Sequence, residues 1–268
     1  MTNQISFPSL GIDLTINRVA FSVFGKDIFW YALIILAGFI LGAVFVAASA
    51  RKRGANPENV WDIALYGLIF GLICARIYYV LFDFDSVRGS ILNVFKIWEG
   101  GIAIYGGIIG AALSSYIYCR KKKLSVTKMF DLCCPGLLIG QSIGRWGNFV
   151  NAEVYGGETS LPWGMSINGG APVHPLFLYE SVWNAAGFLL ILIFRDKKQA
   201  DGQVFFFYIF WYSLGRLFLE GMRQSQYILY LVEGRLGISQ VVAAAGILFG
   251  IFGIIWSKNR MKKNSVNL

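Results

Sequence analysis

The most informative stretch of the chain reads GQSIGRWGNFVNAEVYGG, residues 140–157. It places an arginine, a glutamine, two asparagines and a glutamate beside segments apolar enough to enter a bilayer. A charged side chain at the bilayer centre costs roughly 2.5–3.5 kcal/mol or more, so such residues usually have a function. One interpretation is a polar loop that closes a helix hairpin. The glycines and aromatic residues favour another, a pocket for an anionic lipid headgroup in which Arg145 clamps the phosphate.

The composition is that of a membrane protein. The 268 residues have a mean hydropathy of +0.57, and only 15% of them are charged. We therefore expect one polytopic membrane domain, residues 1–268. The net charge of +9 could indicate a nucleic-acid partner in a soluble protein. Here the basic residues fall in short loops, so membrane topology explains them better, and we expect lipids but no nucleic acid as partners.

Seven apolar segments are candidates to cross the bilayer, which takes about 20 residues. The fourth is short and is interrupted by Pro135 and Gly136. If all seven cross, the main basic clusters lie on one side, which predicts an outer N-terminus and a cytoplasmic C-terminus. The expected fold class is thus an all-α integral membrane protein with seven transmembrane helices. The segments are 28–50, 60–82, 101–119, 129–145, 175–194, 203–222 and 238–257.

Three connecting segments are expected on the outer face, where a site would be assembled. They are residues 84–99, 146–173 and 223–237. The second is rich in glycine and contains two prolines, so we expect it to form no helix. It is predicted to be a small, irregular outer cap that lies on the membrane.

Ionisable residues inside the apolar segments are candidates for function. Arg216 and Glu220 are four residues apart and can pair on one helix face, and Arg223 can share the same carboxylate. This trio is either an internal ion-pair network that holds helices together, or it leaves Arg223 free to face a lipid phosphate. The other candidates are Arg76, Arg145 and Glu180.

The single histidine and the four cysteines carry weaker signals. His174 precedes Pro175, which suits the first position of a helix, so the histidine either caps or hydrogen-bonds there or acts in catalysis. No cysteine has the spacing of a metal site, and the adjacent pair at 133 and 134 is interpreted as packing. We therefore expect neither a metal nor a cofactor.

The central stretch also resembles a known signature. The pattern GRxGNFxNxExxG, residues 144–156, is similar to the signature of the bacterial prolipoprotein diacylglyceryl transferases. Further elements similar to those of the family extend the resemblance over nearly the whole chain. They are Trp30-Tyr31, the glycine-rich run 100–110, the run HPLFLYE at 174–180, and Gly215-Arg216 with Glu220 and Arg223. Trp30-Tyr31 can also be read as an interfacial aromatic anchor.

The resemblance implies an enzyme of the bacterial inner membrane whose active site lies toward the outer face. Such an enzyme transfers the diacylglyceryl group of phosphatidylglycerol to the lipobox cysteine thiol in a prolipoprotein signal peptide. A thioether forms and glycerol phosphate leaves. The catalytic residues that it implies are Arg145, Tyr105, Arg223 and Glu153. The substrate-binding residues that it implies are Arg145, Asn148, Asn151, Tyr31, His174, Tyr179, Glu180 and Glu220, with Tyr179 and Glu180 pointing inward beside Arg145.

Tyr105 marks a departure from the family pattern, in which a histidine precedes the two glycines. This difference argues against a histidine as the general base. A tyrosine, whose ordinary pKa is about 10, is a weak base but can orient or relay a proton.

Two other classes of protein would also place charges within a membrane. A transporter or channel commonly shows internal repeats with paired broken helices, and the sequence shows one interrupted segment and no repeat. A phosphatidyltransferase would call for acidic metal ligands, and the acidic residues here are too sparse.

Overall fold

A computed structural model of the protein describes residues 2–82, 100–232 and 235–266. The expected outer segment 84–99 lies outside these residues. The chain divides into two compact units, one of residues 1–44 with 131–268 and the other of residues 45–130.

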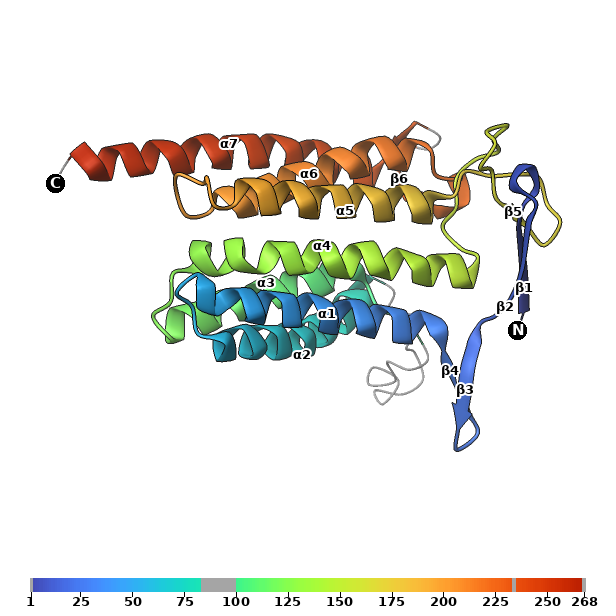
Figure 1. Ribbon diagram of the computed structural model, residues 1–268, viewed down its shortest axis with the longest axis horizontal. Coiled ribbons are helices and arrows are strands. Elements are labelled where there is room, and N and C mark those ends of the chain that lie inside the picture. Colours follow the sequence, from blue (N-terminus) through green and yellow to red (C-terminus); the bar gives the residue numbers. More distant parts are fainter. Residues whose placement is uncertain (1, 83–99, 233–234, 267–268) are drawn as a thin grey trace. The chain divides into compact units, whose positions relative to one another are not determined.

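Helices dominate the described residues, and a helix is present at each of the seven expected places (Figure 1). They are α1 (Trp30–Lys52), α2 (Pro57–Phe82), α3 (Ile104–Lys121), α4 (Val126–Asn151), α5 (Leu176–Phe194), α6 (Gln203–Gly221) and α7 (Ile238–Val266). Among the described helices, α1, α2, α5 and α7 are long and apolar enough to cross a membrane. The protein is therefore a mostly helical membrane protein, as the composition predicts.

Helix α4 continues through Pro135, so the expected interruption at Pro135 and Gly136 was wrong. An internal proline removes a backbone hydrogen bond, a loss that membrane helices tolerate when their neighbours compensate. Gly136 and Gly140 face Gly42 and Gly38 of α1, and a Cβ on Gly42 would lie 2.5 Å from the carbonyl oxygen of Gly136. The four glycines let the two helix backbones approach closely.

Two tryptophans lock α5 against α6. Trp183 and Trp211 stack with ring centroids 4.3 Å apart, and each indole N–H donates to the other residue's carbonyl oxygen at 3.0 Å. Gly187 and Gly215 leave room for these rings, because a Cβ on either would collide with the indole opposite. Helix α6 then packs along α7.

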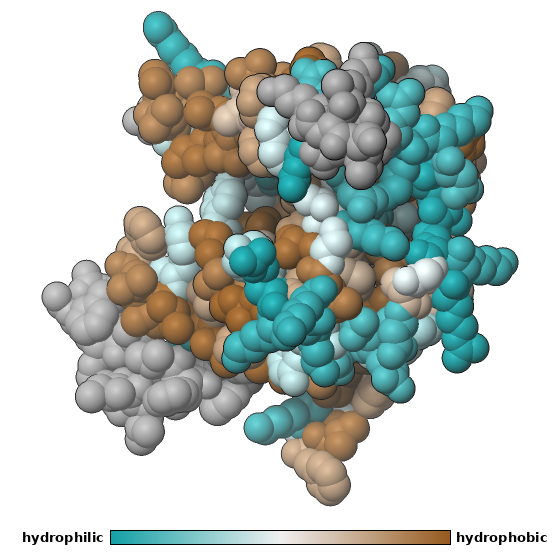
Figure 2. Space-filling model, turned by 90° about the vertical axis from the view of Figure 1, so that its left-hand side faces the viewer, coloured by the Kyte–Doolittle hydropathy of each residue, from teal (hydrophilic) through white to brown (hydrophobic). Residues whose placement is uncertain are grey.

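A buried carboxylate of α4 holds the beginning of α6. Asp131 accepts hydrogen bonds from the backbone N–H groups of Gly202 and Phe205, both at 2.8 Å, and contacts Lys198 at 2.9 Å. The first N–H groups of a helix have no partner within the helix, so Asp131 caps α6 from a neighbouring element. Figure 2 views this end of the molecule, where hydrophilic side chains gather on the surface.

The N-terminal residues form a sheet that the sequence pattern did not reveal. Its middle strand pairs antiparallel on both sides, with Ile5 opposite Leu14 and Ile167. Ile5 is buried in a small apolar core with Met165 and Phe177, so the sheet ties the N-terminus to the segment before α5. The strands, in spatial order, are β2 (Ile12–Asn17), β1 (Thr2–Phe7) and β5 (Ser166–Ile167), and η1 (Pro8–Leu10) joins β1 to β2.

The irregular segment that was expected to form an outer cap begins later than residue 146. Residues 146–151 belong to α4, because Ala152 and Glu153 still donate backbone hydrogen bonds to carbonyls of its last turns. The chain then turns with positive φ at Ala152 and Val154. From there to α5 it is irregular apart from β5 and isolated bridges.

Two small hairpins complete the described structure. The strands β3 (Val19–Val23) and β4 (Lys26–Phe29) lead directly into α1. After α6 come η5 (Ser225–Tyr227) and the short strands β6 (Tyr230–Val232) and β7 (Leu236–Gly237).

In the unit of residues 45–130, glycines let α2 and α3 pack closely. A Cβ on Gly71 would lie 3.2 Å from the Gly107 carbonyl oxygen, and a Cβ on Gly106 or Gly110 would collide with carbonyl oxygens of α2. Gly71 on α2, with Gly106 and Gly110 four residues apart on α3, therefore serves close helix packing in this unit.

Candidate active site

Arg145, near the end of α4, pairs with Glu180 on α5. Its Nη2 lies 2.6 Å from Glu180 Oε2, and its Nη1 donates to Asn148 Oδ1 at 3.4 Å. The Glu180 side chain is 8% exposed and that of Arg145 is 23% exposed. The prediction that Glu180 points inward beside Arg145 is therefore confirmed.

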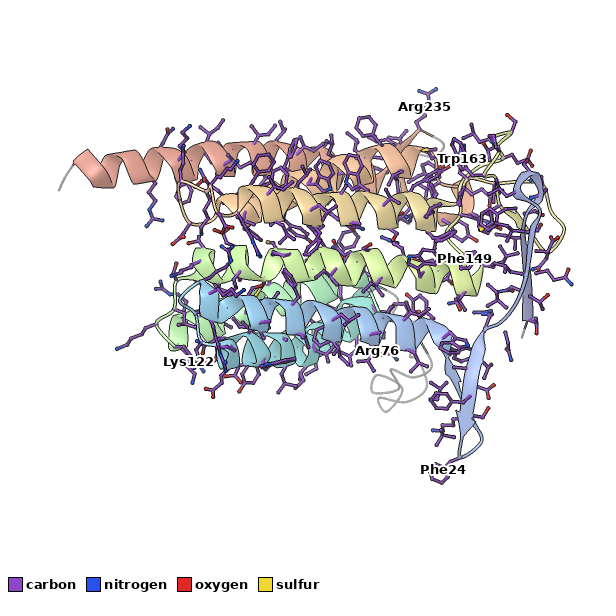
Figure 3. All side chains as sticks on the ribbon, viewed as in Figure 1. Phe24, Arg76, Lys122, Phe149, Trp163 and Arg235 are labelled. Atoms are coloured by element: carbon purple, nitrogen blue, oxygen red, sulfur yellow. The ribbon has the colours of Figure 1, made fainter. Side chains whose placement is uncertain are left out.

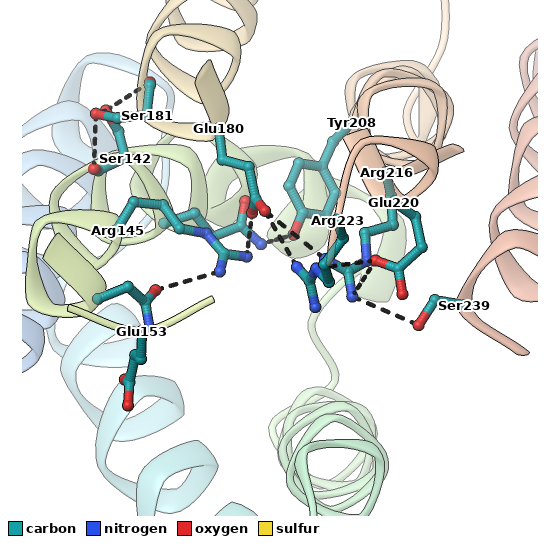
Figure 4. Close-up of polar contacts among 12 residues, drawn as sticks. Ser142, Arg145, Glu153, Glu180, Ser181, Tyr208, Arg216, Glu220, Arg223 and Ser239 are labelled. Carbon is teal, nitrogen blue, oxygen red and sulfur yellow. Dashed lines mark hydrogen bonds and ion pairs between the residues drawn. The ribbon is translucent and has the colours of Figure 1, made fainter. Parts of the chain in front are cut away.

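Two more arginines reach the same place from the end of α6 (Figure 4). Arg216 contacts Glu220 at 2.9 Å, and Arg223 contacts Glu220 at 3.3 Å and Glu180 at 3.2 Å. Arg216 also lies 3.8 Å from Glu180. We call Arg145, Glu180, Arg216, Glu220 and Arg223 the arginine cluster.

The arginine cluster realises the ion-pair network that was one of the two interpretations of the α6 residues. Its three cations and two carboxylates leave a net charge of +1. Removing one partner of such a buried set leaves an uncompensated charge, which costs about 3–5 kcal/mol. The cluster is therefore rigid and also electropositive, which suits an anion.

Exposure separates the three guanidinium groups. The side chain of Arg223 is only 9% exposed, whereas those of Arg145 and Arg216 are 23% and 20% exposed. Burial and the neighbouring Arg216 lower the pKa of Arg223, against the opposite effect of the two carboxylates. The alternative that left Arg223 free to face a phosphate does not fit this geometry. Arg216 was a candidate in the sequence but was left out of the catalytic and substrate-binding residues that the resemblance implies, and its side chain is more accessible than that of Arg223.

Glu153 is held by the two asparagines of the signature. Its Oε1 accepts hydrogen bonds from the side-chain amides of Asn148 at 3.0 Å and Asn151 at 3.2 Å. Asn148 also accepts from Arg145, and Asn151 accepts from Arg18 Nε at 3.3 Å. A continuous polar chain therefore runs from the arginine cluster through Asn148 to Glu153.

Tyr31, in the first turn of α1, lies against the same stretch. A Cβ on Gly147 would lie 2.9 Å from Cδ2 of the Tyr31 ring. The absence of a side chain at Gly147 thus allows the tyrosine to approach the turn of α4 that carries Asn148. Tyr31, for which the resemblance implies a substrate-binding role, therefore lies beside the signature stretch.

His174 and Tyr179 form a separate group. Tyr179 Oη lies 3.3 Å from His174 Nδ1 and accepts a hydrogen bond from Trp163 Nε1 at 2.7 Å; Figure 3 labels Trp163. Helix α5 has Pro175 at its N-cap without a side-chain cap, so the hydrogen-bonding interpretation of His174 fits and the capping one does not. Tyr179 also lines an apolar cavity of about 380 Å³ with Trp163 and Trp183, so it was wrongly expected beside Arg145.

Two other candidates lie in the unit of residues 45–130. Tyr105 is in the first turn of α3. Arg76 on α2 is buried and donates to the carbonyl oxygens of Gly100 and Gly101 at 2.7 and 2.8 Å, with its guanidinium 5.6 Å from the Tyr79 ring centroid. Arg76 therefore orders the segment that leads into α3.

Sequence reasoning missed the polar contacts that fix α4 beside α5 and α6. Ser142 and Ser181 each donate to the other's backbone carbonyl at 2.9 Å, and Trp146 Nε1 donates to Ser181 Oγ at 3.2 Å. Gln141 donates to Tyr208 Oη at 2.8 Å. Small and amide side chains within apolar helices are the available signal, because such residues commonly bond across membrane helices.

Comparison with known proteins identifies the family. The family model for prolipoprotein diacylglyceryl transferase matches residues 18–256. The phosphatidylglycerol–prolipoprotein diacylglyceryl transferase of Clostridioides difficile (strain 630) is 42% identical over 248 residues, which cover 92% of this chain and 98% of that protein. The corresponding transferase of Finegoldia magna is 41% identical over 92% of this chain and 98% of its own, and that of Acaryochloris marina is 42% identical over 85% of each. The chain belongs to the prolipoprotein diacylglyceryl transferase family.

Proposed function

We propose that this transferase moves the diacylglyceryl group of phosphatidylglycerol to the lipobox cysteine of a prolipoprotein signal peptide, the first step of lipoprotein maturation. Its relatives carry phosphatidylglycerol and prolipoprotein in their names, and the family model covers most of the chain. The observation that carries the proposal is the arginine cluster, because it offers two partly exposed guanidinium groups on a rigid, net-positive base.

In this proposal Arg145 and Arg216 grip the lipid phosphate. A guanidinium presents its N–H groups as a planar fork that matches phosphate oxygens. Glu180 and Glu220 occupy part of each fork and fix its direction, so little reorganisation is needed when the lipid binds. Arg223 is buried between Glu180 and Glu220 and does not touch the lipid in this proposal. It positions the two carboxylates.

The nucleophile is the substrate's own thiol. Its sulfur attacks the carbon of the diacylated glycerol that is bonded to the phosphate oxygen. An S–C bond forms and the bond between that carbon and the phosphate oxygen breaks. The electron pair of the broken bond leaves with glycerol phosphate. The departing oxygen gains negative charge, which makes the guanidinium contacts stronger in the transition state than in the ground state. A free thiol has a pKa of about 8.5, and the positive field also favours its thiolate.

The remaining site residues are proposed to orient the two substrates. Glu153, fixed by Asn148 and Asn151, faces the glycerol hydroxyls or the peptide. Tyr105 relays the thiol proton in place of the family's histidine. Tyr31 borders the headgroup, while His174 and Tyr179 border the lipid chains beside the apolar cavity.

We further propose that all seven helices cross the bacterial inner membrane, with the N-terminus outside and the C-terminus in the cytoplasm. The end of α4 and the start of α5 adjoin the N-terminal sheet and the cap. The loop before α6 and the last turns of α7 carry basic residues, including Lys198 and Lys258, as cytoplasmic ends do. The active site is then at the outer leaflet, and both substrates reach it from within the bilayer.

The test is turnover of a lipobox peptide by the protein reconstituted in phosphatidylglycerol vesicles. Arg145→Ala and Arg216→Ala are expected to abolish transfer while the protein still inserts, and Arg145→Lys to restore little, because an ammonium lacks the fork. Arg235→Ala is the matched control, since Arg235 is exposed in the turn before β7. Normal turnover by Arg145→Ala would show that the assigned clamp is wrong.

A further inference from the structure

The hairpin of β3 and β4 is amphipathic. Its register pairs Phe21 with Ile28 and Val23 with Lys26, whereas Ser22 pairs with Asp27. Because side chains alternate between the faces of a strand, the first two pairs lie on one face and the third on the other. The Ser22 hydroxyl donates to Asp27 Oδ1 at 2.6 Å, which closes the polar face.

The tip of this hairpin carries an aromatic residue where turn chemistry disfavours one. Phe24 and Gly25 form a two-residue turn with φ values of +49° and +75°. Turns with two positive φ values prefer Asn-Gly or Asp-Gly, and a bulky residue at positive φ is strained. Phe24 is nevertheless fully exposed, at 102%. Backbone strain retained at an exposed aromatic side chain suggests that the side chain itself has a use.

The hairpin is joined to a membrane-crossing helix at its end. Trp30, the first residue of α1, donates its N–H to the Arg18 carbonyl at 3.0 Å and so closes the base of the hairpin. Figure 1 shows the hairpin running across the direction of α1, and Figure 3 shows Phe24 at its far end. If α1 crosses the bilayer, its first residue lies near the bilayer surface. A hairpin that starts there and runs across the direction of α1 then lies along that surface.

We propose that the β3–β4 hairpin is a lipid-binding arm that rests on the bilayer beside the start of α1. Its apolar face, with Phe21 and Val23, and its tip residue Phe24 contact the acyl chains. Lys26, on the same face, reaches anionic headgroup phosphates, as lysines at a membrane interface do. Asp27 stays in water on the opposite face.

Two observations favour lipid as the occupant. The helix that the hairpin leads into, α1, carries exposed apolar residues of its own, which include Ile35, Leu36 and Ile40. The only charge on that face belongs to Lys26, which complements anionic lipids. The inference needs α1 to enter the membrane and does not depend on which reaction the arginine cluster performs.

The test places the photoreactive residue p-benzoylphenylalanine at position 23, 24 or 22 of the full-length protein. Each variant is reconstituted in vesicles of phosphatidylglycerol and phosphatidylethanolamine that contain an alkyne-tagged phospholipid. Positions 23 and 24 are expected to give several-fold more lipid adduct than position 22, the matched control on the polar face. Equal yields at the three positions, or adducts mainly to a second copy of the chain or to an added lipobox peptide, would overturn the proposal.

Phe24→Asn gives a second test that does not disturb folding, because asparagine suits this turn better than phenylalanine. In this variant the lipid adduct from position 23 is expected to fall several-fold, while the unfolding temperature in detergent stays the same or rises. An unchanged adduct yield in the vesicles would show that Phe24 does not anchor the hairpin.

Discussion

Glu180 is the residue whose replacement tests the arginine cluster most sharply. Its carboxylate is 8% exposed and lies within 4 Å of all three arginines, at 2.6 Å from Arg145, 3.2 Å from Arg223 and 3.8 Å from Arg216. Glu180→Gln keeps the size and a hydrogen-bond acceptor but removes the negative charge. The net charge of the cluster then rises from +1 to +2, with three guanidinium groups around one remaining carboxylate.

The expected loss of stability is about 3–5 kcal/mol, the usual cost of removing one partner from a buried ion pair. The substitution should affect kcat and KM unequally. The extra positive charge keeps phosphatidylglycerol attracted, so KM is not expected to rise. Arg145 loses its anchor, so kcat is expected to fall about 10²-fold, as when one preorganised electrostatic group is lost.

The assay is steady-state transfer to a lipobox peptide in vesicles, with thermal unfolding measured in the same detergent for all variants. Glu158→Gln is the matched control, because Glu158 is an exposed carboxylate in the irregular segment between α4 and α5. The reasoning is refuted if Glu180→Gln keeps a normal kcat, or if it raises KM alone.

Three further predictions concern packing and charge away from the cluster. Gly42→Ala should destabilise the protein by about 1–3 kcal/mol, because the new Cβ would lie 2.5 Å from the Gly136 carbonyl oxygen. Gly67→Ala is the control and should not lower the unfolding temperature, because the atom nearest to its Cβ is 3.9 Å away. Asp131→Asn should cost about 1–3 kcal/mol through the lost cap of α6, and Asp201→Asn, 47% exposed, much less; equal unfolding temperatures for the two variants would contradict the cap. Burial lowers the pKa of Lys198, but hydrogen bonds to Asp201 and Asp131 outweigh it and raise the pKa overall. The stabilisation from Lys198 should therefore be complete below about pH 10.4 and be lost as the pH rises through the raised pKa. The measurement is the difference in unfolding free energy between the wild type and Lys198→Met as a function of pH. If that difference disappears already near neutral pH, the pKa of Lys198 is not raised.

The sequence predicts the helices and much of the site, because both depend on local patterns. Apolar segment length marks where each helix begins to within a few residues, but α4 and α7 continue past the ends of their apolar segments, to Asn151 and Val266. The spacing of Arg216, Glu220 and Arg223 predicts two contacts that the structure contains. The link that joins them to Arg145 runs through Glu180, and it depends on how α4, α5 and α6 pack, which spacing along one helix does not encode.

Other features escaped the sequence for identifiable reasons. The β3–β4 hairpin lacks an Asn-Gly or Asp-Gly turn, because Phe24 occupies the first turn position, so its strongest local signal is missing. Pro135 normally ends a helix, yet here α4 continues where glycines bring α1 against it. Tyr179 and Glu180 are neighbours in sequence, but successive residues of a helix point about 100° apart, so only one of them faces Arg145.

The most direct test of the central claim is a structure of the protein with phosphatidylglycerol bound. The account predicts that the lipid phosphate lies within hydrogen-bonding distance of both Arg145 and Arg216, with Glu180 still holding Arg145. A headgroup docked away from the arginine cluster, with these guanidinium groups still paired only to their carboxylates, would contradict it.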